Sequence, residues 1–186
     1  MDLQGERRIP ASVEETWNAL NDPETLKSCI AGCESLELAG DNEYLAVLGL
    51  KIGPVNAKFK GRLLLLDIVP MASYRILFEG QGGVAGFGKG HAEVRLSFDG
   101  DATTLKYDAQ AQVGGKIAQI GSRLVKSAAA KLADGFFKSF EAKMEGGNPG
   151  QEAGNPDPTR RTADPEGRDT QGREPGPEGR NPDPVA

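Results

Sequence analysis

Residues 105–144 decide the fold, and they read LKYDAQAQVGGKIAQIGSRLVKSAAAKLADGFFKSFEAKM. Up to Val113, apolar and polar side chains alternate, which is typical of a strand with one wet face. After Gly114 and Gly115 the apolar residues recur every three or four positions, which predicts one helix over residues 116–144. A helix of that length is unstable alone in water, so its apolar stripe must pack on the sheet. The predicted stripe comprises Ile117, Ile120, Leu124, Ala128, Leu132, Phe136, Phe140 and Met144.

Upstream of this stretch the chain alternates with period two. The alternating segments are residues 44–52, 57–65, 74–79, 92–98 and 105–113. Turn signals at Asp41-Asn42, Gly53-Pro54 and Asp99-Gly100-Asp101 separate several of them. Because no helix-length segment lies between these strands, we expect an antiparallel meander.

The N-terminal region adds one strand and two short helices. Residues 2–9 form a mixed segment that predicts an opening strand. Ser12 followed by Glu15 matches a capping box, and Pro23 opens a second short helix. The predicted fold class is therefore α+β, with a curved antiparallel sheet of six to seven strands around a long C-terminal helix and two short helices after the first strand.

Composition divides the 186 residues into a globular domain over residues 1–145 and a tail over residues 146–186. The tail holds 8 Pro and 8 Gly, no aromatic residue, and Val185 as its only Val, Ile, Leu, Met or Phe. Such a segment cannot bury enough apolar surface to fold, so we expect a disordered, charged tail. Both parts are slightly acidic within a net charge of −5, which argues against a nucleic-acid-binding function.

Residue counts and the N-terminal sequence argue against several kinds of site and favour one cellular location. His91 is the single histidine, and with Cys29 and Cys33 it is too few ligands for a zinc site. No apolar run approaches the roughly 18–20 residues that span a bilayer. The N-terminus has no basic segment followed by an apolar one, so we expect a cytoplasmic protein that meets a membrane only peripherally.

Residues 80–90 form a glycine-rich stretch that loosely matches two phosphate-binding motifs. Both motifs need a helix directly afterwards, whereas residues 91–98 alternate as a strand. A bulged hairpin connection is the plain interpretation. The functional alternative is a flap or a partner-contact surface, made by Gly82, Gly83, Gly86, Phe87 and Gly88.

The inward faces of the predicted elements mix aromatic with small residues, which leaves two interpretations open. The small residues either let helix and sheet pack closely or leave an apolar cavity. The residues predicted to line such a cavity are Trp17, Leu48, Leu50, Phe59, Leu63, Phe78, Val94, Tyr107, Ala109, Ile120, Leu124, Ala128 and Phe136. The polar or ionisable side chains predicted to point inward are Arg7, Tyr44, Tyr74 and Tyr107. We expect no catalytic residue and no metal site.

The order of elements resembles the helix-grip fold of the START superfamily (SRPBCC), which includes plant allergens. More closely, several segments are similar to the family of carbon monoxide dehydrogenase G subunits. They are GE (5–6), RIPA (8–11), WNALNDP (17–23), CIxGCESL (29–36, where x is Ala31 and the family often has Pro), GPV (53–55), AKFKG (57–61), GQGG (80–83) and AQAQVGGKIAQIGSRL (109–124). The resemblance covers about residues 2–144 and excludes the tail.

The resemblance implies a non-enzymatic accessory protein of a carbon monoxide dehydrogenase-type molybdenum hydroxylase. It implies an apolar quinone- or lipid-like ligand and no covalent cofactor. It also implies attachment of the partner enzyme to the cytoplasmic face of the inner membrane. The family supplies no catalytic residue to carry over, and this tail ends in NPDPVA (181–186), which argues against a C-terminal membrane anchor.

Two other functions compete with this one. The superfamily also contains cyclase- and hydrolase-type enzymes, which would need polar groups pointing into the cavity. A scaffold protein with a solid interior and no ligand is the third alternative.

Overall fold

The computed structural model describes residues 1–146; residues 147–186, which hold nearly all of the predicted tail, lie outside the described residues. The described elements follow one another as β1 (Asp2–Ile9), α1 (Val13–Leu20), α2 (Pro23–Cys29), β2 (Cys33–Gly40), β3 (Glu43–Ile52), β4 (Val55–Val69), β5 (Ser73–Gln81), a 3-10 turn η1 (Gly83–Ala85), β6 (Phe87–Asp99), β7 (Ala102–Gly114), α3 (Lys116–Gln119) and α4 (Ser122–Gly146).

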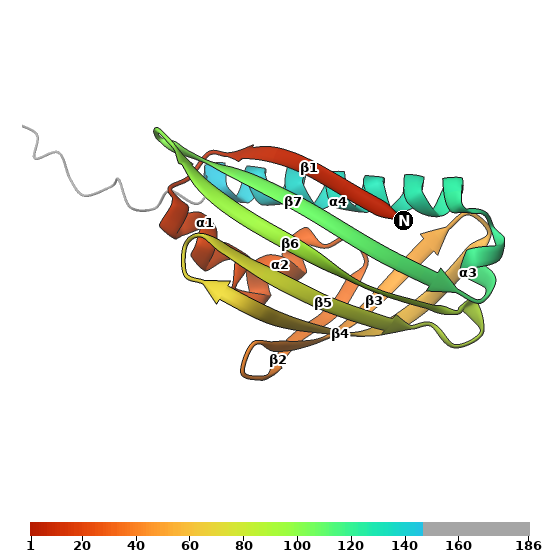
Figure 1. The fold of residues 1–186 in the computed structure, drawn as a ribbon. Coiled ribbons are helices and arrows are strands. Elements are labelled where there is room, and N and C mark those ends of the chain that lie inside the picture. Colours follow the sequence, from red (N-terminus) through yellow and green to blue (C-terminus); the bar gives the residue numbers. More distant parts are fainter. Residues whose placement is uncertain (147–186) are drawn as a thin grey trace, which may run out of the picture. The chain divides into compact units, whose positions relative to one another are not determined.

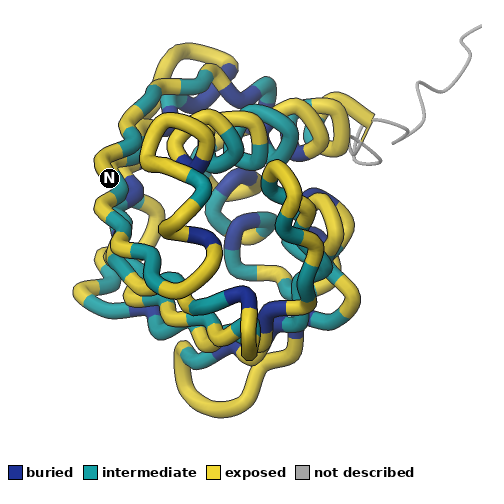
Figure 2. The backbone as a smooth tube through the Cα atoms, turned by 90° about the vertical axis from the view of Figure 1, so that its right-hand side faces the viewer, coloured by how far each residue is buried: buried dark blue, intermediate teal, exposed yellow. Residues whose placement is uncertain are grey.

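The seven strands form one antiparallel sheet in the order β1-β7-β6-β5-β4-β3-β2. The sheet curves beneath α4, with α1 and α2 near one end and α3 at the other (Figure 1). Seen at 90° to that view, the strands wrap an interior that the helix closes from above (Figure 2). The predicted fold class and strand number are confirmed.

The turns between strands follow the sequence signals closely. Asn42, Gly53 and Gly100 take positive φ values of 58°, 56° and 67° in three of the hairpin connections. Asparagine and glycine tolerate this left-handed conformation at little cost, which is why they mark tight hairpins.

The two N-terminal helices begin at the caps that the sequence predicts. The Ser12 hydroxyl accepts a hydrogen bond from the Glu15 backbone N–H, and the Glu15 carboxylate accepts one from the Ser12 N–H. Asp22 caps α2 through the Thr25 N–H at 2.9 Å, with Pro23 in the first turn. These caps fix where each helix starts against the end of the sheet.

The prediction of one unbroken helix from Lys116 to Met144 is wrong. The chain makes a short helix α3, breaks at Ile120 and Gly121, and starts again at Ser122. Gly121 has a φ of 98°, a conformation that no helix interior accepts and that glycine adopts most easily. The break shifts the phase of the helix that follows, so Val125, Phe137 and Phe140 are its buried residues.

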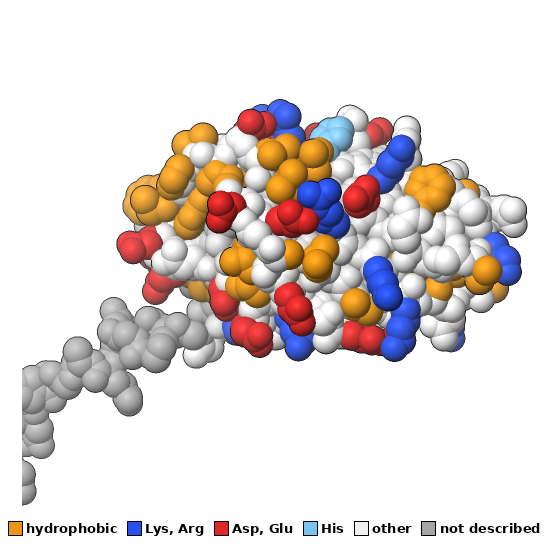
Figure 3. Space-filling view, turned by 90° about the horizontal axis from the view of Figure 1, so that it is seen from below, with side chains coloured by type: hydrophobic (Ala, Val, Ile, Leu, Met, Phe, Trp, Pro, Cys, Tyr) orange, Lys and Arg blue, Asp and Glu red, His pale blue; other side chains and the backbone are white. Residues whose placement is uncertain are grey.

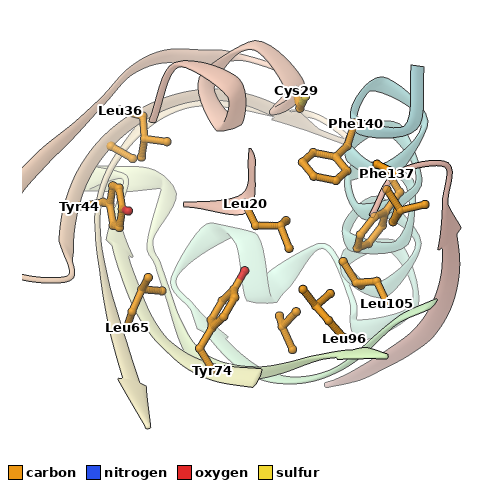
Figure 4. Close-up of a cluster of buried hydrophobic side chains, with 14 residues drawn as sticks. Leu20, Cys29, Leu36, Tyr44, Leu65, Tyr74, Leu96, Leu105, Phe137 and Phe140 are labelled. Atoms are coloured by element: carbon orange, nitrogen blue, oxygen red, sulfur yellow. The ribbon is translucent and has the colours of Figure 1, made fainter. Parts of the chain in front are cut away.

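The interior contains two clusters of buried residues. The larger one joins α1, α2 and the C-terminal half of α4 to the sheet around Leu105 and Phe140, which are 1% and 0% exposed (Figure 4). The smaller one lies near the start of α4 and comprises Phe59, Ala85, Ile117 and Val125. Apolar burial of this kind is the main stabilising term for a fold of this size.

An ion pair fixes α4 to the edge strand β1. The Arg7 guanidinium donates to Asp134 at 2.6 Å and lies 5.5 Å from the centre of the Phe137 ring. Asp134 also pairs with Lys138 at 2.9 Å. Hydrogen bonds from Arg7 and then Lys138 lower the pKa of Asp134 below its ordinary value of 3.8.

We expect Asp134→Asn to lower the thermal denaturation temperature modestly at pH 7 and by less at pH 3, which lies below the ordinary pKa of 3.8. A carboxyl whose pKa is lowered in the folded state stabilises that state above its unfolded pKa, and this stabilisation disappears as pH falls through the folded pKa. Thermal denaturation of both proteins across this pH range tests the expectation, and an equal difference at both pH values would contradict it.

Candidate functional site

Two cavities lie between the sheet and α4. The first, the tyrosine-lined cavity, has a volume of about 310 Å³ and is bordered almost entirely by apolar atoms. It is lined by Leu3, Leu20, Leu26, Ile30, Leu36, Tyr44, Leu63, Leu65, Tyr74, Ile76, Val94, Leu105, Tyr107, Ala109, Ala133, Phe136 and Phe137. Its volume falls within the range of small-molecule sites.

The second, the phenylalanine-lined cavity, lies nearer the start of α4 and has a volume of about 320 Å³. Its apolar lining comprises Met1, Ala46, Leu48, Leu50, Ile52, Phe59, Leu63, Phe78, Phe87, Ala111, Val113, Ile117, Val125, Ala129 and Leu132. Leu63 borders both cavities, which lie one after the other along α4; the pair is called the elongated apolar space below.

The polar groups of this space are phenol hydroxyls in the tyrosine-lined cavity. Tyr44 and Tyr74 are 6% and 5% exposed, and burial raises the pKa of both phenols, that of Tyr74 most strongly. Both therefore stay neutral at physiological pH. The third inward tyrosine, Tyr107, stacks on Phe137 with ring centres 5.0 Å apart. The shape and lining of this space would suit an apolar molecule, and its phenol hydroxyls lie at one end.

Most cavity residues predicted on strands are placed in the cavities. Leu63, Val94, Tyr107 and Ala109 border the tyrosine-lined cavity, joined by Phe136 from α4. The residues bordering the phenylalanine-lined cavity are Leu48, Leu50, Phe59, Leu63 and Phe78. Alternation with period two located them because inward and outward side chains strictly alternate in a strand.

The helical part of the predicted site is less accurate. Leu124 is 52% exposed, and Leu124 and Ala128 border a surface groove instead of either cavity, because the break at Gly121 rotates α4. Ile120 packs against the smaller buried cluster. Trp17 is not among the cavity-lining residues; its ring packs edge-on against Tyr74 at 5.6 Å.

Of the inward polar groups, Arg7 pairs with Asp134, and the Tyr44 hydroxyl donates to the Asn21 carbonyl oxygen. The sequence signalled Tyr44 and Tyr74 only through their strand parity. Val125 and Ala85, both buried in the smaller cluster, were missed. Ala85 carries no periodic signal because it lies in a single 3-10 turn.

The glycine-rich stretch forms the connection between β5 and β6. A strand follows it directly, so the phosphate-binding motifs lack the helix they need. Ala85, 3% exposed, holds the 3-10 turn against the interior, while Val84 at its tip is 84% exposed. Phe87 and Gly88 border the phenylalanine-lined cavity. The connection is thus anchored at one residue and touches the apolar space.

We expect Gly86→Ala to lower the thermal denaturation temperature far more than Gly83→Ala. Gly86 has a φ of 110°, and a Cβ atom there would overlap the Gly114 carbonyl oxygen. Gly83 has a φ of 59°, and its Cβ would meet nothing within 4 Å. The control therefore carries only the left-handed backbone cost, about 1 kcal/mol. Equal shifts in the two variants would contradict the close approach of this loop to β7.

The outer face of the sheet carries two wider hollows of about 540 and 870 Å³. Charged side chains of both signs mix with hydrophobic ones there, next to His91, the one histidine (Figure 3). His91 is exposed and its neighbours across the strands are Leu77 and Gln110. This open, mixed surface differs sharply from the apolar interior.

The cysteines are free thiols. Cys29 is buried at the end of α2, and burial raises the pKa of the half-buried Cys33. Within residues 1–146 no cluster of three or more His, Cys, Asp or Glu side chains is arranged to hold a metal ion. In the same part of the chain, no helix combines the length and the apolar character needed to cross a membrane.

Comparison with known families gives one match over most of the chain. A family model described as the G subunit of carbon monoxide dehydrogenase (CoxG) matches residues 5–145. A search of curated protein sequences gave no match.

Solved structures share the fold. A conserved protein from Geobacillus kaustophilus is 35% identical, with a TM-score of 0.74, covering 78% of this chain and 96% of that one. A START superfamily protein from Mycobacterium smegmatis is 16% identical, with a TM-score of 0.60, covering 78% of this chain and 97% of that one. The Zhui aromatase/cyclase from Streptomyces sp. R1128 is 12% identical, with a TM-score of 0.56, covering 78% of this chain and 93% of that one. At these last two identities the likeness concerns the fold alone.

Proposed function

Because the chain belongs to the CoxG family of carbon monoxide dehydrogenase, we propose that it is a non-enzymatic accessory protein that carries an apolar ligand for a carbon monoxide dehydrogenase-type molybdenum hydroxylase. At the level of the family, the role is an accessory one associated with carbon monoxide dehydrogenase. The ligand is a quinone- or lipid-like molecule, held between the sheet and α4. The protein works in the cytoplasm and links its partner enzyme peripherally to the inner membrane.

The observation that carries the ligand part of the proposal is the apolar space under α4. Two adjoining cavities of about 310 and 320 Å³ are bordered by aliphatic and aromatic side chains and meet at Leu63. An apolar molecule that leaves water for such a space gains roughly 25 cal/mol for each Å² of apolar surface it buries. A charged or strongly polar metabolite would lose its hydration there without compensation.

The non-enzymatic part rests on the character of the inward groups. Two of the phenols that border the tyrosine-lined cavity, Tyr44 and Tyr74, have a pKa raised by burial. General acid–base catalysis is most efficient when the pKa of the group lies near the working pH. Phenols with raised pKa values suit hydrogen bonding to a ligand better than proton transfer.

The alternative is a cyclase-type enzyme. Its support is the fold shared with the Zhui aromatase/cyclase and the presence of phenols inside the cavity. A third function, a scaffold that holds no ligand, would treat the two cavities as packing defects.

Purification from the native host followed by native mass spectrometry and solvent extraction separates these functions. A bound isoprenoid or fatty molecule is the expected result. A polar metabolite would favour the cyclase, and a protein that carries nothing and takes up no added quinone would favour the scaffold. Co-purification of a tagged chain with a molybdenum hydroxylase from the membrane fraction tests the partner, with the cytosolic fraction as its comparison.

A further inference from the structure

The Tyr74 hydroxyl faces the tyrosine-lined cavity and has no hydrogen-bond partner among residues 1–146 (Figure 4). The Tyr74 side chain on β5 is 5% exposed, and within the described residues its hydroxyl makes no hydrogen bond. Trp17 packs edge-on against its ring, which fixes the ring direction. Figure 4 shows its oxygen pointing from the sheet into the interior toward Leu20. Among the described residues Thr16 Oγ1 is the fully buried side-chain atom that lacks a partner. The unpaired Tyr74 hydroxyl is instead open to the cavity, where a ligand atom can accept its hydrogen bond.

The other two phenols of the same cavity are placed differently. Tyr44 donates its proton to the backbone oxygen of Asn21 at 3.2 Å. The Tyr107 hydroxyl lies against β1, because a Cβ atom at Gly5 would approach it to 2.5 Å. Tyr74 is therefore the phenol of the three that is free to donate into the cavity, and burial keeps it protonated.

The phenylalanine-lined cavity has no such donor among its inward side chains. Charged residues of β4, β5 and β6 also border it, namely Arg62, Glu79 and Lys89. They occupy strand positions that alternate with the inward Phe78 and Leu63 and are exposed, so their charged ends lie on the outer face. The elongated space therefore has one end with a hydrogen-bond donor and one end that is wholly apolar.

A surface groove lies beside the apolar end, and Lys51, Ser127 and Lys131 border it together with apolar residues. This groove of about 390 Å³ between α4 and β3 shares Leu50, Ile52 and Leu132 with the phenylalanine-lined cavity. β2 pairs with β3 as far as Leu48, and the Gly49 N–H donates to the Gly32 carbonyl oxygen at 2.8 Å, so residues 50–52 form the sheet edge that β2 leaves uncovered. Leu124, 52% exposed, borders the same groove.

We propose that the ligand carries an oxygen that accepts a hydrogen bond from Tyr74, and that its apolar chain runs through the phenylalanine-lined cavity to the groove between α4 and β3. This inference rests on the proposed function and adds an orientation to it: the oxygen-bearing head lies inside and the chain end lies at the surface. A carbonyl group, as in a quinone ring or an acyl ester, is the acceptor that fits; a plain hydrocarbon lacks it.

The head-group contact is tested by Tyr74→Phe with Tyr107→Phe as the matched control. The probes are decylubiquinone, which carries carbonyl oxygens, and diphenylhexatriene, a hydrocarbon. Trp17 is the single tryptophan and touches Tyr74, so quenching of its fluorescence reports quinone binding directly. We expect Tyr74→Phe to weaken decylubiquinone binding about three- to tenfold, as the loss of one hydrogen bond implies, and to leave the hydrocarbon unaffected.

The same variant has a second readout that does not depend on a ligand. Because Tyr74→Phe removes an unpaired buried hydroxyl, the ligand-free variant is expected to denature at the same or a higher temperature than the parent. A clear loss of stability would show that the hydroxyl has a structural partner, which would overturn the inference.

The direction of the ligand's apolar chain is tested at the groove with Ala128→Phe. Ala130→Phe, on the exposed side of α4, is the control. We expect Ala128→Phe to weaken the binding of a quinone with several isoprene units severalfold and to leave the binding of a quinone with one unit unchanged. Equal weakening of both homologues, or unchanged decylubiquinone binding in Tyr74→Phe, would overturn the orientation while the proposed function stands. Failure of the parent protein to bind any of the probes would contradict the proposed function itself.

Discussion

Val125→Asp is expected to abolish folding or soluble expression, whereas Leu124→Asp, one position earlier, is expected to change stability little. Val125 is 5% exposed and packs in the cluster with Phe59, Ala85 and Ile117. An ionised carboxylate placed there loses its hydration without a partner, which costs several kcal/mol, comparable to the whole stability of a small domain. Leu124 is 52% exposed, so a carboxylate there remains hydrated.

The measurement is soluble yield followed by urea denaturation of whichever variants fold. Lys126→Asp, on an exposed position of the same turn, controls for the change of charge within this basic stretch of α4. If Leu124→Asp were the variant that failed to fold, the helix would have the orientation that its sequence alone predicts, with Leu124 inside and Val125 facing solvent.

This pair of residues shows where reading the sequence by periodicity fails. Leu124 continues the three- and four-residue spacing set by Ile117 and Ile120, so the pattern favours it as an inward residue. Gly121 interrupts the helix with a φ of 98°, and the spacing no longer corresponds to one continuous face. A single glycine does not reveal which conformation it adopts, because glycine is also tolerated inside helices at a modest cost. Only the packing around the break decides it.

For the sheet, in contrast to the helix, periodicity predicted the inward face correctly. Its side-chain period is two, and one face is wet, so a shift of a single residue would place lysines such as Lys58 and Lys60 in the interior. The alternation in residues 57–65 therefore fixes both the strand and its inward face. The structure pairs Phe59 with Leu48 and Leu63 with Phe78, as that alternation requires.

The candidate site lies between these two cases. Strand parity located most of the residues that border the cavities and identified the three inward tyrosines, but it could not tell their roles apart. Their different roles depend on contacts far apart in sequence: Tyr44 with Asn21, Tyr107 with Gly5, and Tyr74 with Trp17. Whether small inward residues leave a cavity was equally open, because close packing and an empty space give the same pattern of alanines and glycines.

Ala109→Phe is expected to reduce binding of decylubiquinone at least tenfold while changing the free energy of unfolding by less than about 1 kcal/mol. Ala109 lies on β7 between Leu3 and Ala92 and borders the tyrosine-lined cavity. A phenyl ring added there enters a space of about 310 Å³, so it removes room for a ligand and gains apolar contacts of its own. Overpacking of a filled core instead typically costs about 1–3 kcal/mol.

An open cavity and a filled core are therefore distinguished by measuring stability and ligand binding on the same protein. Urea denaturation of the ligand-free variant gives its stability, and Trp17 quenching by decylubiquinone gives its binding affinity. Ala130→Phe on the exposed side of α4 supplies the same added ring without access to the interior, and it should leave both quantities unchanged. Strong destabilisation by Ala109→Phe, together with no measurable binding by the parent, would mean that the interior is solid in solution. A stable variant that no longer binds would place the ligand beside β7, within reach of Tyr74, because both residues border the same cavity.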